Sequence, residues 1–244
     1  GIRITILSNP FGHAFVLGWL SLPVTVLWII IITNAFNLVD GIDGLAAGTG
    51  ILISATLFFL LGEHDIYLRM TFAILVGSLV GFLVYNFPPA SIFMGDSGSL
   101  FVGFFLASVT IISSNKAAAM ATMMIPILSF SLPVIDMLYA VLRRYYRGIP
   151  LGEADKEHIH HKLLEKGLSR KKVVLLLYSV NIIIMGCILL VVRRQLNIDF
   201  FGLLIFVIVV AIGLRIFGYI EFIPAIRQAL KNNDIRRKSK FFTY

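Results

Sequence analysis

The sequence predicts an all-α, polytopic transmembrane helical bundle, and three observations support this prediction. Hydrophobic residues make up 58% of the 244-residue chain and charged residues only 14%, whereas about a quarter of an average soluble domain is charged. The charges are clustered, so that long stretches carry none: 4–39, 44–62, 70–95, 97–115, 117–135, 173–192 and 200–214. These stretches are continuously apolar, which is typical of membrane helices and not of alternating barrel strands.

The elements follow in order along a single transmembrane domain, residues 1–244. Residues 1–7 alternate in the strand period, an Asn-Pro-Phe-Gly turn signal follows at 9–12, and residues 13–20 could return as a second strand, which predicts a small extracytoplasmic β-hairpin over residues 1–21. Residues 22–222 contain about seven spans, and the polar stretch 143–171 and the basic tail 223–244 complete the chain. The spans are expected at 22–37, 44–62, 67–86, 98–114, 117–142, 172–192 and 200–222.

The distribution of basic residues predicts the orientation in the membrane. Each span reverses the side, so the loops after the first, third, fifth and seventh spans share one face. That face carries nine Lys/Arg in residues 143–172 and six from Arg227 onward, against five on the opposite face. Cytoplasmic loops are enriched in Lys and Arg, so this face is expected to be cytoplasmic. The same bias explains the net charge of +8 without a nucleic-acid partner.

A pair of aspartates follows the first predicted span, in Asn37-Leu-Val-Asp40-Gly-Ile-Asp43-Gly44. Two carboxylates three residues apart can share a helical face, and glycines allow a ligand to approach the backbone. The pair suits a hydrated divalent cation, sugar hydroxyls or a general base. The alternative is structural, with Asp43 capping the second span.

A third aspartate lies in Phe93-Met-Gly-Asp96-Ser97-Gly98, a short loop before the fourth span. A helix N-terminus favours anions, so Asp96 could hold Mg²⁺ while nearby amides meet a phosphate. The alternative is again N-capping, by Asp96 or Ser97.

The polar stretch contains His158-Ile-His160-His161 and opens with Arg143-Arg144. Histidines beside basic residues are suitable donors to a diphosphate. This spacing matches no zinc signature, and Cys187 is the single cysteine of the chain. The alternative for this stretch is a solvated loop that sets topology. Asp136, within the fifth predicted span, could be either a functional carboxylate or a helix-packing group.

Taken together and in this order, these motifs resemble the polyprenyl-phosphate N-acetylhexosamine-1-phosphate transferases. The His-Ile-His-His form is similar to the undecaprenyl-phosphate GlcNAc-1-phosphate transferase branch, because the muramoyl-pentapeptide branch typically has three consecutive histidines. The resemblance implies transfer of GlcNAc 1-phosphate from UDP-GlcNAc to a polyprenyl phosphate, with release of UMP and a requirement for Mg²⁺, with Mn²⁺ as an alternative. It also implies a multi-pass protein of the inner, cytoplasmic membrane, and a homodimer is one expected assembly.

The resemblance also implies roles for individual residues. Asp96 would be the Mg²⁺ ligand, and Asp40 and Asp43 would be the other catalytic carboxylates. The substrates would be bound by Asn37, Asn86, Phe93, Arg143, Arg144, His158, His160 and His161. Members of the family have about eleven spans and an adjacent aspartate pair, so the sequence is expected to lack the N-terminal third.

Three other functions remain open at this point. One is the phospho-N-acetylmuramoyl-pentapeptide transfer of peptidoglycan synthesis. The second is transport, which favours ionisable groups near mid-membrane and often an inverted repeat; here the charges gather at one surface and no repeat is visible. The third is a non-catalytic structural role.

Overall fold

The computed structural model describes residues 2–7, 15–61, 65–116, 128, 130–147, 163–165, 167–193, 201, 204 and 208. Two short strands, β1 (Ile6–Leu7) and β2 (Phe15–Val16), pair antiparallel, with Ile6 opposite Val16. They occupy the segment in which the sequence predicts a hairpin. A 3-10 turn, η1 (Gly18–Leu20), then leads into the helices.

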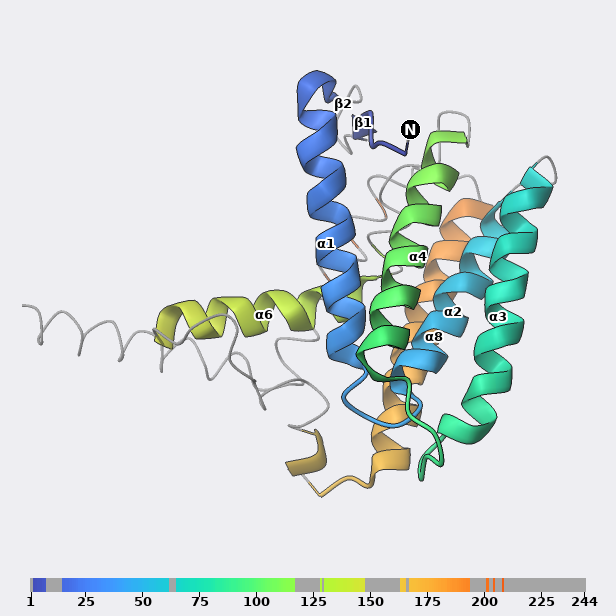
Figure 1. Ribbon diagram of the computed structural model, residues 1–244, viewed down its shortest axis with the longest axis vertical. Coiled ribbons are helices and arrows are strands. Elements are labelled where there is room, and N and C mark those ends of the chain that lie inside the picture. Colours follow the sequence, from blue (N-terminus) through green and yellow to red (C-terminus); the bar gives the residue numbers. More distant parts are fainter. Residues whose placement is uncertain are drawn as a thin grey trace, which may run out of the picture.

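The described helices are α1 (Ser21–Val39), α2 (Leu45–Leu60), α3 (Ile66–Asn86), α4 (Gly95–Lys116), α6 (Ser131–Arg147) and α8 (Arg170–Arg193). α1 packs on α4, and α2 packs on both α3 and α8. These five helices run side by side in one bundle (Figure 1). The side chains buried most completely between them include Ile32, Phe36, Ile53, Phe72 and Leu106.

Four segments of the described chain are long and apolar enough to cross a membrane: Gly18–Val39, Ile66–Asn86, Gly95–Ser113 and Arg170–Val191. Large apolar side chains on their outer faces are exposed, as lipid-facing positions require; Ile30, Ile74 and Ile183 are examples. The protein is therefore an integral membrane protein. This agrees with the polytopic helical fold that the sequence predicts.

The described part does not reach the predicted count of seven spans. α2 occupies the second predicted span but has 16 residues, fewer than the roughly 20 that a bilayer core requires. The helix described within the fifth predicted span, 117–142, is α6. It runs across the direction of the bundle (Figure 1). α6 ends in Arg143-Arg144-Tyr-Tyr-Arg147, so its last turns are too polar for a span. The seventh predicted span and the tail 223–244 lie almost wholly outside the described residues.

The connections that carry the aspartate motifs meet at one end of the bundle. The turn after α1, the loop before α4 and the first residues of α8 all lie at the end opposite β1 and β2 (Figure 1). The alternating direction of α1, α2, α3 and α4 causes this, because every second connection returns to the same end.

Candidate active site

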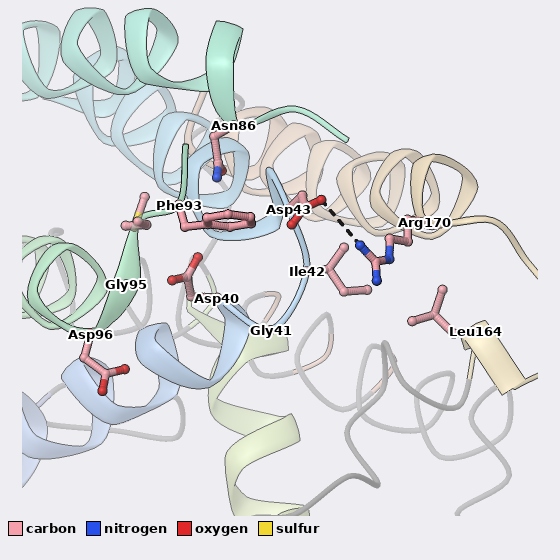
Figure 2. A pocket seen from close by; sticks show the side chains of 11 residues that line it. Asp40, Gly41, Ile42, Asp43, Asn86, Phe93, Gly95, Asp96, Leu164 and Arg170 are labelled. Atoms are coloured by element: carbon pink, nitrogen blue, oxygen red, sulfur yellow. Dashed lines mark ion pairs between the residues drawn. The ribbon is translucent and has the colours of Figure 1, made fainter. Parts of the chain in front are cut away.

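A pocket of about 590 Å³ opens at this end of the bundle. Figure 2 shows its lining side chains, which come from the turn after α1, the end of α3 and the start of α4 with their connection, the helical turn 163–165 and the start of α8. Three carboxylates line the pocket, together with one basic side chain among the described residues. The lining residues are Asp40, Gly41, Ile42, Asp43, Asn86, Phe93, Met94, Gly95, Asp96, Leu164 and Arg170.

Residues 40–44, called the acid turn below, connect α1 to α2. α1 ends at Val39, and the Asp40 N–H donates to the Asn37 carbonyl at 3.1 Å. Gly44 precedes α2 with φ of +79°, a left-handed conformation that glycine adopts without a steric penalty. Its N–H donates to Asn86 Oδ1 at 2.9 Å. The acid turn is therefore fixed to the end of α3 by a side chain.

Asp43 is held from two sides. Its Oδ2 accepts the Ala90 N–H at 3.2 Å and lies 3.7 Å from Arg170 Nη1. The Asp43 side chain is 13% exposed and that of Arg170 is 69% exposed. The capping alternative for Asp43 is wrong, because Gly44 occupies the N-cap of α2 and no side chain caps this helix.

Asp40 lies near the other two carboxylates of the pocket. Its pKa is raised from 3.8 to about 6, chiefly by burial and also by the charges of Asp96 and Asp43, while a hydrogen bond from the Gly95 N–H lowers it. These neighbours show that the three carboxylates are within electrostatic reach of one another. A bound cation would relieve their mutual repulsion.

Asp96 is exposed and lies in the first turn of α4. The capping alternative is wrong here too, because α4 begins at Gly95 and places both Asp96 and Ser97 inside the helix. A carboxylate in the first turn still interacts favourably with the helix dipole. Because the side chain is exposed and lines the pocket, a ligand in the pocket can reach it.

The predicted nucleotide-binding residues are placed differently. Phe93 lines the pocket and is 73% exposed. Asn86 also lines it but is 2% exposed, and its Nδ2 donates to the Ile92 carbonyl at 2.9 Å. Asn37 does not line the pocket; its Oδ1 accepts the Ser99 hydroxyl at 2.5 Å and so joins α1 to α4.

The other predicted residues lie away from the described pocket or outside the described part of the chain. His158, His160 and His161 lie outside the described residues, as does the side chain of Arg143. Arg144 is half-buried on α6 and is not among the lining residues. Asp136 is buried on the same helix.

Sequence reasoning missed several residues of the site. Arg170 was counted only as one of the charges that set topology, yet it faces Asp43 across the pocket. Met94 and Leu164 supply apolar lining. Tyr178, two turns beyond Arg170 on α8, donates its hydroxyl hydrogen to the Gly44 carbonyl. No local signal in the sequence marks these contacts, because all of them join segments far apart in the chain.

The donor set fits a sparsely ligated divalent cation. Within the part of the chain that the structure describes, no three His, Cys, Asp or Glu side chains converge as a ready metal cage. Mg²⁺ usually binds through one or two carboxylates together with waters and substrate phosphates. The exposed Asp96 and the half-buried Asp40 suit that mode, because the remaining positions would be filled by the substrate.

Comparison with known proteins agrees with the sequence motifs. Residues 1–114 match the model of glycosyl transferase family 4. The matched region contains the acid turn, Asn86, Phe93 and Asp96, and therefore most of the described pocket.

Curated relatives extend the similarity beyond the matched region. The chain is 40% identical over 185 residues to the probable undecaprenyl-phosphate N-acetylglucosaminyl 1-phosphate transferase of Bacillus subtilis (strain 168), covering 75% of this chain and 52% of that protein. It is 37% identical over 210 residues to the decaprenyl-phosphate N-acetylglucosaminephosphotransferase of Mycobacterium leprae (strain TN), covering 76% and 53%. It is 31% identical over 190 residues to the phospho-N-acetylmuramoyl-pentapeptide-transferase of Synechococcus elongatus, covering 75% and 50%. The chain thus spans about half the length of these relatives.

Proposed function

We propose that the protein transfers N-acetylglucosamine 1-phosphate from UDP-GlcNAc to a polyprenyl phosphate such as undecaprenyl phosphate, releasing UMP. The main support is that Asp40, Asp43 and Asp96, from separate segments, line one pocket at the end of a membrane helix bundle. The 40% identity to the Bacillus subtilis relative favours this reaction over pentapeptide transfer, for which the similarity is 31%.

The position of the pocket suits a lipid acceptor. The pocket opens where apolar helices long enough to span a membrane end. A polyprenyl chain could stay among the lipids while its phosphate reaches the carboxylates. The basic bias of the sequence supports the cytoplasmic face of the inner membrane as the side that holds the pocket, where a nucleotide sugar is available.

The overall reaction forms one phosphorus–oxygen bond and breaks another. An oxygen of the lipid phosphate becomes bonded to the phosphorus that carries GlcNAc, and the bond from that phosphorus to the UMP oxygen breaks. UMP leaves with the electron pair of the broken bond. Phosphoryl transfer of this kind is catalysed mainly by positioning and by electrostatic stabilisation.

The carboxylates alone would repel a diphosphate, so the pocket requires positive charge. Arg170 is the cation among the described lining residues. Mg²⁺, or Mn²⁺ in its place, would be held by Asp96 and would supply charge stabilisation at the phosphates. We assign the further cationic contacts to Arg143, Arg144, His158, His160 and His161, and stacking against the uracil to the exposed Phe93. Asp40 and Asp43 would orient the acceptor and the metal-bound network.

The test is a transfer assay with the full-length protein in detergent and a radiolabelled donor. We expect label to move from UDP-GlcNAc to polyprenyl phosphate, with UMP as the second product, and EDTA should stop the reaction until Mg²⁺ is restored. We expect no transfer when UDP-MurNAc-pentapeptide is offered as the donor. Transfer from the pentapeptide donor alone would favour the other branch, and transfer from neither donor would refute the proposal.

A further inference from the structure

The acid turn is held at Gly44 by two different helices. The Gly44 N–H donates to Asn86 Oδ1 on α3, and the Gly44 carbonyl accepts the hydroxyl of Tyr178 on α8. The same carbonyl also accepts the Gly48 N–H at 3.0 Å, the first bond of α2. Both polar groups of the residue that follows Asp43 are therefore fixed by contacts from outside the turn.

Gly48 provides the space for Tyr178. A Cβ at this position would lie 2.0 Å from Cζ and from the hydroxyl oxygen of Tyr178. No real side chain can come so close, so the ring could not reach Gly44 past an alanine. The glycine one turn into α2 and the tyrosine on α8 form one interlocking contact, and this contact brings α8 against the start of α2.

α8 also reaches the acid turn at a second point. Arg170, eight residues before Tyr178, pairs with Asp43 at 3.7 Å. Eight residues of helix span about 12 Å, so the two contacts hold the turn at separate places along α8. A turn fixed in this way cannot shift without breaking a hydrogen bond to Gly44.

We propose that Tyr178 is a positioning residue of the active site, because its hydroxyl, through Gly44, sets where Asp40 and Asp43 stand relative to Asp96. This inference rests on the proposed transfer reaction. Catalytic groups displaced by about 1 Å can lose roughly a hundredfold in rate. The hydroxyl does not touch the pocket itself, since Tyr178 is not among its lining residues. Its effect is therefore on rate and not on donor binding.

The test compares two ways of breaking the contact in the full-length protein. Tyr178→Phe removes the hydroxyl, and Gly48→Ala displaces the ring. We expect Tyr178→Phe to lower kcat at least about tenfold, with the KM for UDP-GlcNAc within about threefold of wild type and little change in Tm. Gly48→Ala should lower kcat in the same way. Ser179→Ala is the matched control, because this exposed hydroxyl bonds only to the Leu175 carbonyl of its own helix; its kcat should stay within twofold.

A second readout does not depend on activity. Hydrogen–deuterium exchange of residues 40–48 should be faster in Tyr178→Phe than in wild type and unchanged in Ser179→Ala. If the wild-type protein shows no transfer activity, the proposed function is refuted. The exchange experiment would still test whether the Tyr178 hydroxyl holds the acid turn in place. The positioning role is overturned if Tyr178→Phe keeps its kcat per folded enzyme, or if exchange over residues 40–48 does not change.

Discussion

Asp43 and Asp96 line the same pocket, but their surroundings differ. Asp43 is largely covered, accepts the Ala90 N–H and pairs with Arg170, whereas Asp96 is exposed in the first turn of α4. A carboxylate that is already bonded to other groups of the protein stabilises the structure of the pocket. A carboxylate that faces open space is the one available to a cation or a substrate. The following predictions test this contrast.

Asp96→Asn should have the largest effect on activity and almost none on stability. The change keeps the size of the side chain but removes the charge that would hold the cation, so we expect turnover to fall by roughly a thousandfold. Tm should stay within about 2 °C of wild type, because the exposed side chain packs against little. Transfer of labelled GlcNAc 1-phosphate and Tm are measured on the same preparations.

Asp65→Asn is the matched control for Asp96, since Asp65 precedes α3 at the other end of the bundle and makes no side-chain cap. It should keep full activity. An Asp96→Asn enzyme that turns over normally would remove Asp96 from the metal site.

Asp43→Ala should lower both activity and stability. It removes the acceptor of the Ala90 N–H and the partner of Arg170, so we expect activity to fall by about a hundredfold and Tm to fall by about 2–4 °C. Asp43→Asn keeps an oxygen for the Ala90 N–H and should restore most of the Tm but little of the activity. If Asp43→Ala leaves Tm unchanged, the contrast with Asp96 is wrong.

Asn86→Leu tests the connection between the acid turn and the end of α3. The substitution leaves the Gly44 N–H and the Ile92 carbonyl without their partner, and an unsatisfied buried group costs about 1–3 kcal/mol. We expect a lower Tm and a kcat reduced by about tenfold. Asn34→Leu on α1 is the control, because this exposed amide bonds only to its own helix. An Asn86→Leu protein that is as stable and active as Asn34→Leu would show that the Asn86 side chain does not hold the acid turn in place.

Arg170→Gln should have the smallest effect. The guanidinium is 69% exposed, and exposed ion pairs contribute at most about 1 kcal/mol, so Tm should hardly change. Loss of a cation from the pocket lining should raise the KM for the anionic donor by a few-fold, and this increase should shrink at high salt. Lys171→Gln, an exposed neighbour that does not line the pocket, should leave KM unchanged. Equal KM values in the two variants would exclude Arg170 from donor binding.

Part of the site could be predicted from the sequence because its chemistry lies in short, local motifs. Asp40, Asp43 and Asp96 are recognisable as carboxylates among glycines at the ends of apolar stretches, and counting spans places them at one end of a bundle. The structure brings all three into one pocket. The described residues do not confirm the count of seven spans, because a 16-residue apolar helix and an amphipathic helix lying across the bundle occupy two of the predicted spans.

The sequence by itself determined that this is a helical membrane protein and placed Asp40, Asp43 and Asp96 on the same face of the membrane, because apolar length and the parity of spans are properties of the chain in order. Only the tertiary structure decided how those carboxylates differ. Asn86, Arg170 and Tyr178 contact the acid turn although they are separated from their partners by 42, 127 and 134 positions in the sequence. Contacts over such separations depend on how the helices pack, and helix packing depends on the fit of surfaces such as Gly48 against Tyr178, which no local pattern records.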